Sequence, residues 1–148
     1  MDKVQLDKSV NHHIALSAIM IKRVFYKILN ENNLNITPEQ WSILYYLSES
    51  ANLTVSELAE LTFKDFANIS RITHKLEKAG LIKKQKHSTD KRISIFFITD
   101  TGTKLVNHVH KCAYKSTNIS MQGIEPQERE IILRSLKLIL INTNNYLK

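Results

Sequence analysis

Basic side chains are concentrated in one stretch of the chain, between Arg71 and Arg92. Its 22 residues include eight Lys or Arg and two Asp or Glu, so the stretch carries +6 of the formal net charge of +7. Lysine and arginine bind nucleic-acid phosphates, and arginine also pairs with the edge of guanine. The stretch therefore predicts contact with an anionic partner, although a merely solvated charged face is the alternative reading.

Residues suited to reading base edges begin just before this stretch. Asn68 and Arg71 are the expected base readers, because asparagine suits adenine and arginine suits guanine. Lys75 and Lys78 are better placed for phosphates. The full set of expected DNA contacts is Asn68, Ser70, Arg71, His74, Lys75, Lys78, Lys84, Lys86, Asp90, Lys91 and Arg92.

The sequence Asp90-Lys91-Arg92 combines a carboxylate and a guanidinium two residues apart. Residues with this spacing share a face of an extended chain, so we expect Asp90 to orient Arg92. An arginine held in this way can enter a narrow, A/T-rich minor groove.

Local signals assign these residues to a helix and a hairpin. Asp65 is expected to cap a helix that ends at Gly80. A shorter helix, begun by a capping box of Thr54 and Glu57, precedes it by about three residues, which makes a helix-turn-helix candidate. Segments 81–86 and 93–98, joined by the polar connection 87–90, are predicted to form a β-hairpin.

The remaining segments are predicted to be helical, at about 8–29, 38–49, 100–119 and 126–146. The expected order is α-α-α-α-β-β-α-α, a mainly α fold with a small β-hairpin wing. At 148 residues, with 43% of them hydrophobic, the chain has the size and composition of one globular domain.

Several function classes are disfavoured by composition. No apolar run approaches the roughly 18 residues that cross a bilayer, and no signal-peptide pattern begins the chain, so we expect a soluble, cytoplasmic protein without a membrane partner. One Cys excludes a disulfide framework. Three Gly leave no phosphate-cradling loop, and no Gly-x-Ser-x-Gly turn occurs, so we expect neither an enzyme nor a cofactor.

Taken together, the motifs resemble the MarR family of bacterial transcriptional regulators. The residues that carry the resemblance are Thr37-Pro38-x-Gln40, Ser56-Glu57-Leu58-Ala59, Ile69-Ser70-Arg71-Ile72, Leu76-Glu77-Lys78-Ala79-Gly80-Leu81-Ile82, Asp90-Lys91-Arg92 and Ile98-Thr99-Asp100-Thr101-Gly102. The resemblance implies a winged helix-turn-helix DNA-binding domain at 36–102 and dimerisation helices at 1–35 and 103–148. It also implies a homodimer that binds a pseudo-palindromic operator, with one recognition helix in each of two successive major grooves. We expect a repressor, with an activator as the alternative. The apolar stripes of the helices outside the winged helix favour a dimer independently.

Members of this family commonly release DNA on binding a small aromatic effector, or on sensing oxidation or a metal. Met20, Trp41, Tyr45 and Tyr46 are candidates to line an effector cavity, although such residues at helical spacing usually form core. Cys112 is expected to be a buried structural thiol rather than a redox sensor. His108 and Cys112 share a helix face, but Trp41 and Ser42 stand where zinc-sensing relatives have ligands, so no metal site is expected.

The main alternative is a winged-helix architectural or protein-interaction module that binds nucleic acid without sequence preference. The sequence leaves open the target promoters, the choice between repression and activation, and the identity of any effector.

Overall fold

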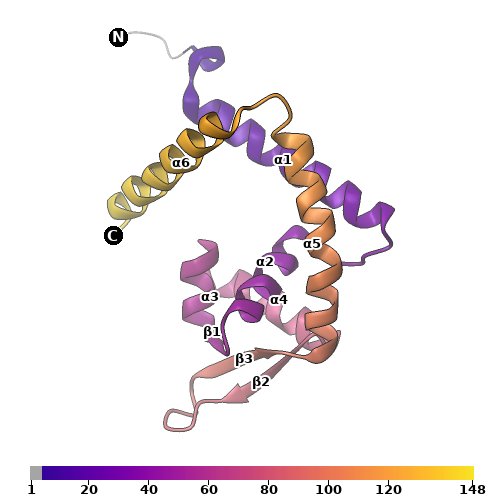
Figure 1. Cartoon of the computed structure of the whole chain (residues 1–148). Helices are drawn as coiled ribbons and strands as arrows, with labels where there is room; N and C mark the ends of the chain where they lie inside the picture. Colours follow the sequence, from indigo (N-terminus) through magenta and orange to yellow (C-terminus); the bar gives the residue numbers. More distant parts are fainter. Residues whose placement is uncertain (1–4) are drawn as a thin grey trace. The chain divides into compact units, whose positions relative to one another are not determined.

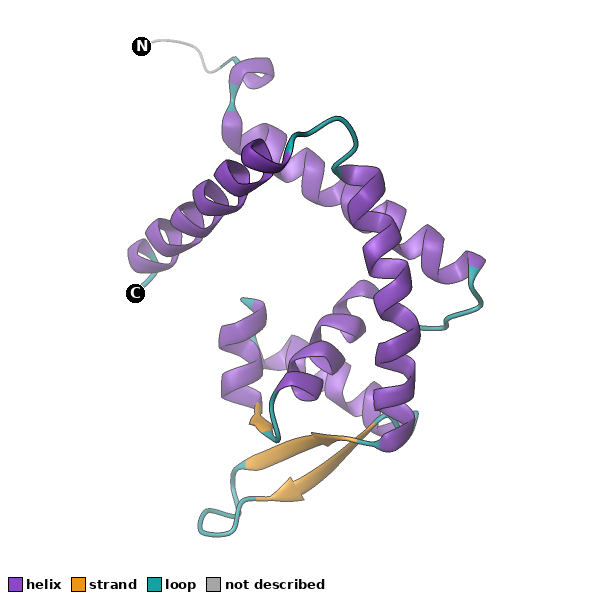
Figure 2. Ribbon diagram, viewed as in Figure 1, coloured by secondary structure: helices purple, strands orange, loops and turns teal. Residues whose placement is uncertain are grey.

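The computed structural model describes residues 5–148. It confirms the predicted mainly helical fold with a small β-sheet (Figure 2). The elements are η1 (Leu6–Lys8, a 3-10 helix), α1 (Val10–Glu31), α2 (Pro38–Glu49), β1 (Leu53–Thr54), α3 (Val55–Thr62), α4 (Phe66–Lys78), β2 (Ile82–Lys86), β3 (Ser94–Ile98), α5 (Asp100–Ser120) and α6 (Pro126–Tyr146). The chain divides into two compact units, one ending at Ser116 and one of Thr117–Lys148, and we describe each by itself.

The core of the first unit is built from one apolar face of each of its main elements. Leu44 of α2, Leu58 of α3 and Leu76 of α4 are fully buried. Phe96 of β3 and Val109 of α5 belong to the same buried cluster. The helix-turn-helix, the sheet and α5 therefore share one hydrophobic core, which fixes the positions of α4 and of the hairpin base.

Two capping boxes start helices as the sequence predicts. The Thr37 hydroxyl accepts from the Gln40 N–H at 3.2 Å, and the Gln40 side chain accepts from the Thr37 N–H at 2.9 Å. Thr54 and Glu57 make the corresponding pair of bonds at 3.2 and 2.7 Å. The backbone N–H of Thr54 is the main reason that the pKa of Glu57 lies below its ordinary value.

The sheet has three antiparallel strands in the order β1-β3-β2. Phe96 pairs with Leu53 on one side and with Lys84 on the other. The two-residue β1 was not predicted, because so short a strand has no recognisable alternation. The predicted hairpin is confirmed, with each strand beginning one residue later than expected.

Helix α6 lies in the second unit and begins at Pro126, as predicted. Gly123, in the left-handed region at φ 80°, precedes it. The Arg129 guanidinium donates to the carbonyl oxygens of Met121 and Ile124, at 2.9 and 2.7 Å, and so ties the connecting loop to the helix. Every residue of α6 is exposed or half-buried in this single chain.

Candidate nucleic-acid interface

Helix α4 is held to the core by one face, which leaves the opposite face free. Its first turn is capped by Asp65, whose carboxylate accepts from the Asn68 N–H at 2.7 Å. Ile69 and Leu76 are fully buried, as the sequence predicts. The predicted contact residues that are exposed on this helix are Ser70, Arg71, His74, Lys75 and Lys78. The structure thus brings these five side chains to the exposed side of one short helix.

Asp65, Asn68 and Arg71 form a chain of side-chain hydrogen bonds along the start of α4. The Asn68 amide nitrogen donates to Asp65 at 3.0 Å, and the Arg71 guanidinium donates to the Asn68 amide oxygen at 2.7 Å. The hydrogen bond from the Asn68 backbone N–H is the main cause that lowers the pKa of Asp65. The chain restrains the Arg71 side chain before any ligand is present. Both polar atoms of Asn68 take part in this chain, and each has capacity for one further hydrogen bond.

A hollow of about 340 Å³ lies between α4 and the start of α2. Lys64, Arg71 and Lys75 contribute cationic side chains to its lining, and Glu39 contributes a carboxylate. Lys64 was not among the residues predicted from the sequence. Its position in the sequence could have indicated this role, because Lys64 directly precedes the N-cap Asp65 and so lies close to the first turn of α4.

The hairpin β2–β3 carries the second group of predicted contacts. Lys84 and Lys86 are exposed on β2, and Lys91 is exposed in the connecting loop. Figure 1 shows the hairpin projecting from the helices of the first unit to a narrow tip. Cations therefore line both α4 and the wing.

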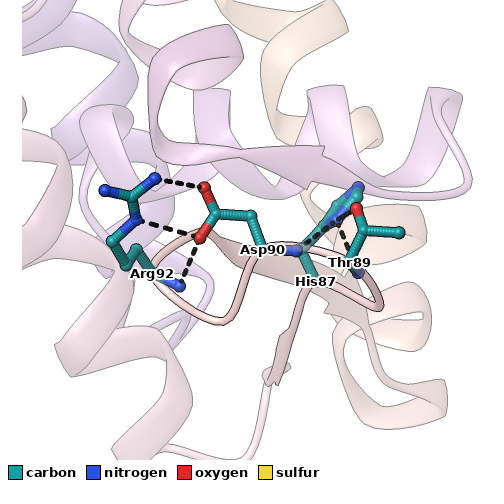
Figure 3. Close-up of polar contacts among 4 residues, drawn as sticks. All are labelled: His87, Thr89, Asp90 and Arg92. Carbon is teal, nitrogen blue, oxygen red and sulfur yellow. Dashed lines mark hydrogen bonds and ion pairs between the residues drawn. The ribbon is translucent and has the colours of Figure 1, made fainter.

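The wing tip contains the predicted Asp90–Arg92 pair (Figure 3). The Arg92 Nε and Nη2 atoms donate to the two Asp90 carboxylate oxygens, each at 3.1 Å, and the Arg92 backbone N–H donates at 3.0 Å. The expected reason was wrong, however. The pair does not lie in an extended strand but in a turn closed by the bond from the Ile93 N–H to the Asp90 carbonyl at 3.1 Å.

Arg92 holds the pKa of Asp90 below its ordinary value, chiefly through the side-chain hydrogen bond. The Arg92 side chain remains 91% exposed. His87 accepts from Thr89 and Asp90 on the other side of the loop (Figure 3). The tip therefore presents a guanidinium whose direction is set by its own turn.

Comparison with known proteins identifies relatives of this fold. A match to the MarR family covers residues 36–94. The HTH-type transcriptional regulator FarR of Neisseria gonorrhoeae is 32% identical over 101 residues, which are 68% of each protein. The chain belongs to the MarR family.

Two solved structures of DNA-binding proteins share the fold. Bordetella bronchiseptica BpsR, studied for regulation of its DNA binding by 6-hydroxynicotinic acid, superposes with a TM-score of 0.86 at 19% identity, covering 93% of this chain and 97% of BpsR. A variant of E. coli MarR complexed with operator DNA superposes with a TM-score of 0.83 at 19% identity, covering 95% and 99%.

As a member of the MarR family, the chain is a DNA-binding transcriptional regulator and not an enzyme. Across the described residues, no helix is long and apolar enough to cross a membrane. Nor do residues 5–148 bring together three His, Cys, Asp or Glu side chains in a group that could hold a metal ion.

Two of the predicted effector residues, Trp41 and Tyr45, lie against each other, with ring centroids 5.7 Å apart. Trp41 lies edge-on to His110, with ring centroids 5.1 Å apart, and Tyr45 lies 6.0 Å from the same ring. Met20 is 54% exposed, so it does not belong to the core. A groove of about 700 Å³ runs between α1 and the start of α2, but none of these three predicted residues lines it. Cys112 is buried on α5, as expected.

Proposed function

We propose that the chain is a homodimeric repressor that binds a pseudo-palindromic operator, with α4 in the major groove and the wing in the minor groove. The observation that carries the proposal is the exposed face of α4, where Arg71 is restrained by Asn68 and Asp65 beside further cationic side chains. A helix presented in this way fits the major groove, and residues near its N-terminal end reach base edges.

In this proposal Arg71 pairs with guanine, and Ser70 and His74 contact neighbouring base edges. Lys64, Lys75 and Lys78 bind phosphates on either side of the groove and fix the register of the helix. The main role of Asn68 in this proposal is to position Arg71, because its amide bonds to both Asp65 and Arg71.

The wing supplies a second contact. Arg92, aimed by Asp90, enters the minor groove, where a narrow A/T-rich segment has the most negative potential. Lys84, Lys86 and Lys91 bind the flanking phosphates. Loss of these lysines should weaken binding to all duplexes, since phosphate contacts carry no sequence information.

A homodimer is supported by the apolar surface that each of the two units, taken by itself, leaves uncovered. Large hydrophobic side chains are exposed on α1 at Leu16 and Ile19, and on α6 at Leu133, Leu138 and Ile141. Monomeric proteins rarely expose so much apolar surface on long helices. A two-fold pair would present two copies of α4 to half-sites about one DNA turn apart. Repression follows most simply, because a dimer seated across two turns would obstruct the promoter.

A competition titration tests this proposal against a non-specific architectural role. Duplexes selected by the full chain from a random pool are titrated against random duplex of equal length. A sequence-specific regulator should prefer the selected duplex by roughly a thousandfold or more. A preference near unity would instead support the architectural alternative.

We extend the proposal to a small aromatic effector that releases DNA. The cluster of Trp41, Tyr45 and His110 supports it, because edge-to-face rings offer an aromatic ligand further stacking partners. Met20 stays among the proposed effector contacts, because its side chain on α1 is exposed and can be reached by a ligand. Trp41 is the single Trp, so its fluorescence reports binding directly. An aromatic acid that quenches it and also lowers operator affinity would support the extension, and quenching without release would contradict it.

A further inference from the structure

The turn that leads into α4 exposes two phenylalanine side chains. Phe63 is 62% exposed and Phe66 is 59% exposed, although phenylalanine is normally buried when the fold permits. Phe66 is the first residue of α4, and Phe63 lies in the turn between α3 and α4. Two exposed aromatic rings therefore flank the end of the helix that is proposed to read DNA.

Phe66 lies on the same strip of helix surface as the proposed base contacts. Residues four apart on a helix lie one above the other, which aligns Phe66, Ser70 and His74. All three are exposed. Phe66 is the member nearest the N-terminal end, which is the end that reaches deepest among base edges in helix-turn-helix proteins.

The backbone at Phe63 is a second, independent observation. Its φ of 53° and ψ of 35° place it in the left-handed region, where glycine avoids the clash that any larger residue suffers. Strained residues of this kind concentrate at functional sites. A bulky ring is thus retained in a position that stability alone would assign to glycine.

We propose that Phe66, with Phe63 beside it in the turn, contacts the 5-methyl group of a thymine in each operator half-site. Thymine alone among the four bases presents a methyl group in the major groove, and phenylalanine is one of the side chains that recognise it. DNA is favoured over a protein partner because Lys64 and Arg71 stand next to the turn, and such cations attract a polyanion. The inference rests on the proposed function, and it specifies one base, a thymine, in each half-site of the DNA sequence that the protein prefers.

The experiment removes the methyl group without changing base pairing. The preferred duplex recovered by the full chain is resynthesised with deoxyuridine in place of each thymine in turn. Each duplex is titrated with the wild-type protein and with Phe66→Ala. The wild type should lose about fourfold in affinity per half-site at one thymine position, the loss expected for one buried methyl group. Phe66→Ala should bind the thymine and deoxyuridine duplexes equally at that position.

Two further variants separate contact from general disturbance. Phe66→Leu keeps an apolar side chain and should retain part of the sensitivity to the methyl group. Leu61→Ala shortens another exposed apolar side chain, on α3, and should leave the sensitivity unchanged. Circular dichroism of each variant verifies the fold, which a change at an exposed position should preserve.

The results separate this inference from the proposed function. A pool that yields no preferred duplex overturns both. A preferred duplex whose wild-type affinity is insensitive to methyl removal, or equally sensitive in Phe66→Ala, overturns the thymine contact alone. A Phe66→Ala protein that binds the operator normally but fails to repress in cells also overturns it, and assigns the two rings to a protein partner.

Discussion

The exposure of Arg71 was predicted correctly, whereas the contacts around it were not. Its type and spacing from Ile69 and Ile72 follow from the helical period, so its exposure was predictable. Its bond to Asn68 was not, because an exposed amide has several rotamers and partners of similar energy. In the structure the Asn68 amide takes one of these arrangements, in which its oxygen accepts from Arg71 and its nitrogen donates to Asp65.

A double-mutant cycle on Asn68 and Arg71 tests this arrangement. Arg71→Ala should cost about 1 to 3 kcal/mol of operator affinity and relax the preference at one guanine. If Asn68 acts by positioning Arg71, Asn68→Ala should weaken the same guanine preference, and the two losses should be clearly non-additive. A loss at an adenine, additive with Arg71→Ala, would restore Asn68 as a base reader. Lys84→Ala is the control, since it should weaken all duplexes alike and lower the salt slope by about one.

The pKa of Asp90 tests whether its carboxylate braces the Arg92 side chain at the wing tip. Its pKa lies below the ordinary value of 3.8 because Arg92 hydrogen-bonds to the ionised form. The brace therefore contributes above that ordinary value, is complete at neutral pH, and is lost as the pH falls through the lowered pKa. The Asp90 carboxyl resonance, followed by NMR, should show a midpoint below 3.8. In Arg92→Ala the midpoint should rise toward the ordinary value, although the backbone N–H of residue 92 still lowers it in part. An unchanged midpoint would contradict the interaction between the two side chains.

Helices and their boundaries were the most predictable elements, because their signals are local. Thr37 and Thr54 each begin a capping box that spans four residues, and both boxes form. Strand β1 escaped prediction because its pairing with β3 joins segments some forty residues apart, which no short pattern encodes. The conformation of Phe63 escaped for a related reason, since sequence signals for the left-handed region favour Gly and Asn.

The turn between α3 and α4 should become more stable when its strain is removed. Phe63→Gly relieves the left-handed backbone and removes a ring that is mostly exposed, so the free energy of unfolding should rise by about 1 kcal/mol. Thermal unfolding should then shift upward by roughly 2 to 4 °C. Phe63→Ala is the matched control, because it removes the ring but keeps the strain. A Phe63→Gly protein no more stable than Phe63→Ala would contradict the strain, because both variants lack the ring and differ only in the cost of the left-handed backbone.

The junction between the hairpin and α5 depends on the absence of a side chain at Gly102. A Cβ atom there would lie 2.2 Å from the Leu81 carbonyl oxygen and 2.7 Å from Ile98 Cγ1. Gly102→Ala should therefore cost about 1 to 3 kcal/mol in urea unfolding, through overpacking against backbone that cannot easily move. Operator affinity should fall as well, because the shift displaces the hairpin base. Lys104→Ala, an exposed change in the same turn, should alter stability by about 0.5 kcal/mol or less.

At the scale of the whole molecule, the sequence predicted apolar stripes on the terminal helices but could not identify what covers them. Amphipathic periodicity reports that a face is apolar, and a subunit core and a subunit interface give the same pattern. Within its own unit α6 has no buried residue, so its apolar face is left for a partner outside that unit, either the rest of the chain or a second copy. The predicted division at 36–102 stays a prediction.

Leu138→Glu tests the homodimer without disturbing the isolated subunit. Leu138 is 56% exposed, so a charge there should cost little in the single chain, but it should be costly once buried between subunits. Sedimentation at micromolar concentration should show a dimer for the wild type and a single subunit for the variant. Lys137→Glu, a neighbouring change on the same helix, controls for added charge. A dimeric Leu138→Glu protein would place the interface elsewhere.

The turn at the wing tip has a consequence for the thermodynamics of association. The hydrogen bonds that shape it run among residues 87–93, from His87 to Ile93, and need no partner to form. A loop that folds only on its target produces a large negative change in heat capacity as it orders. If the wing binds DNA as proposed, the loop is already shaped before binding, so little of the heat-capacity change of complex formation should originate at the wing.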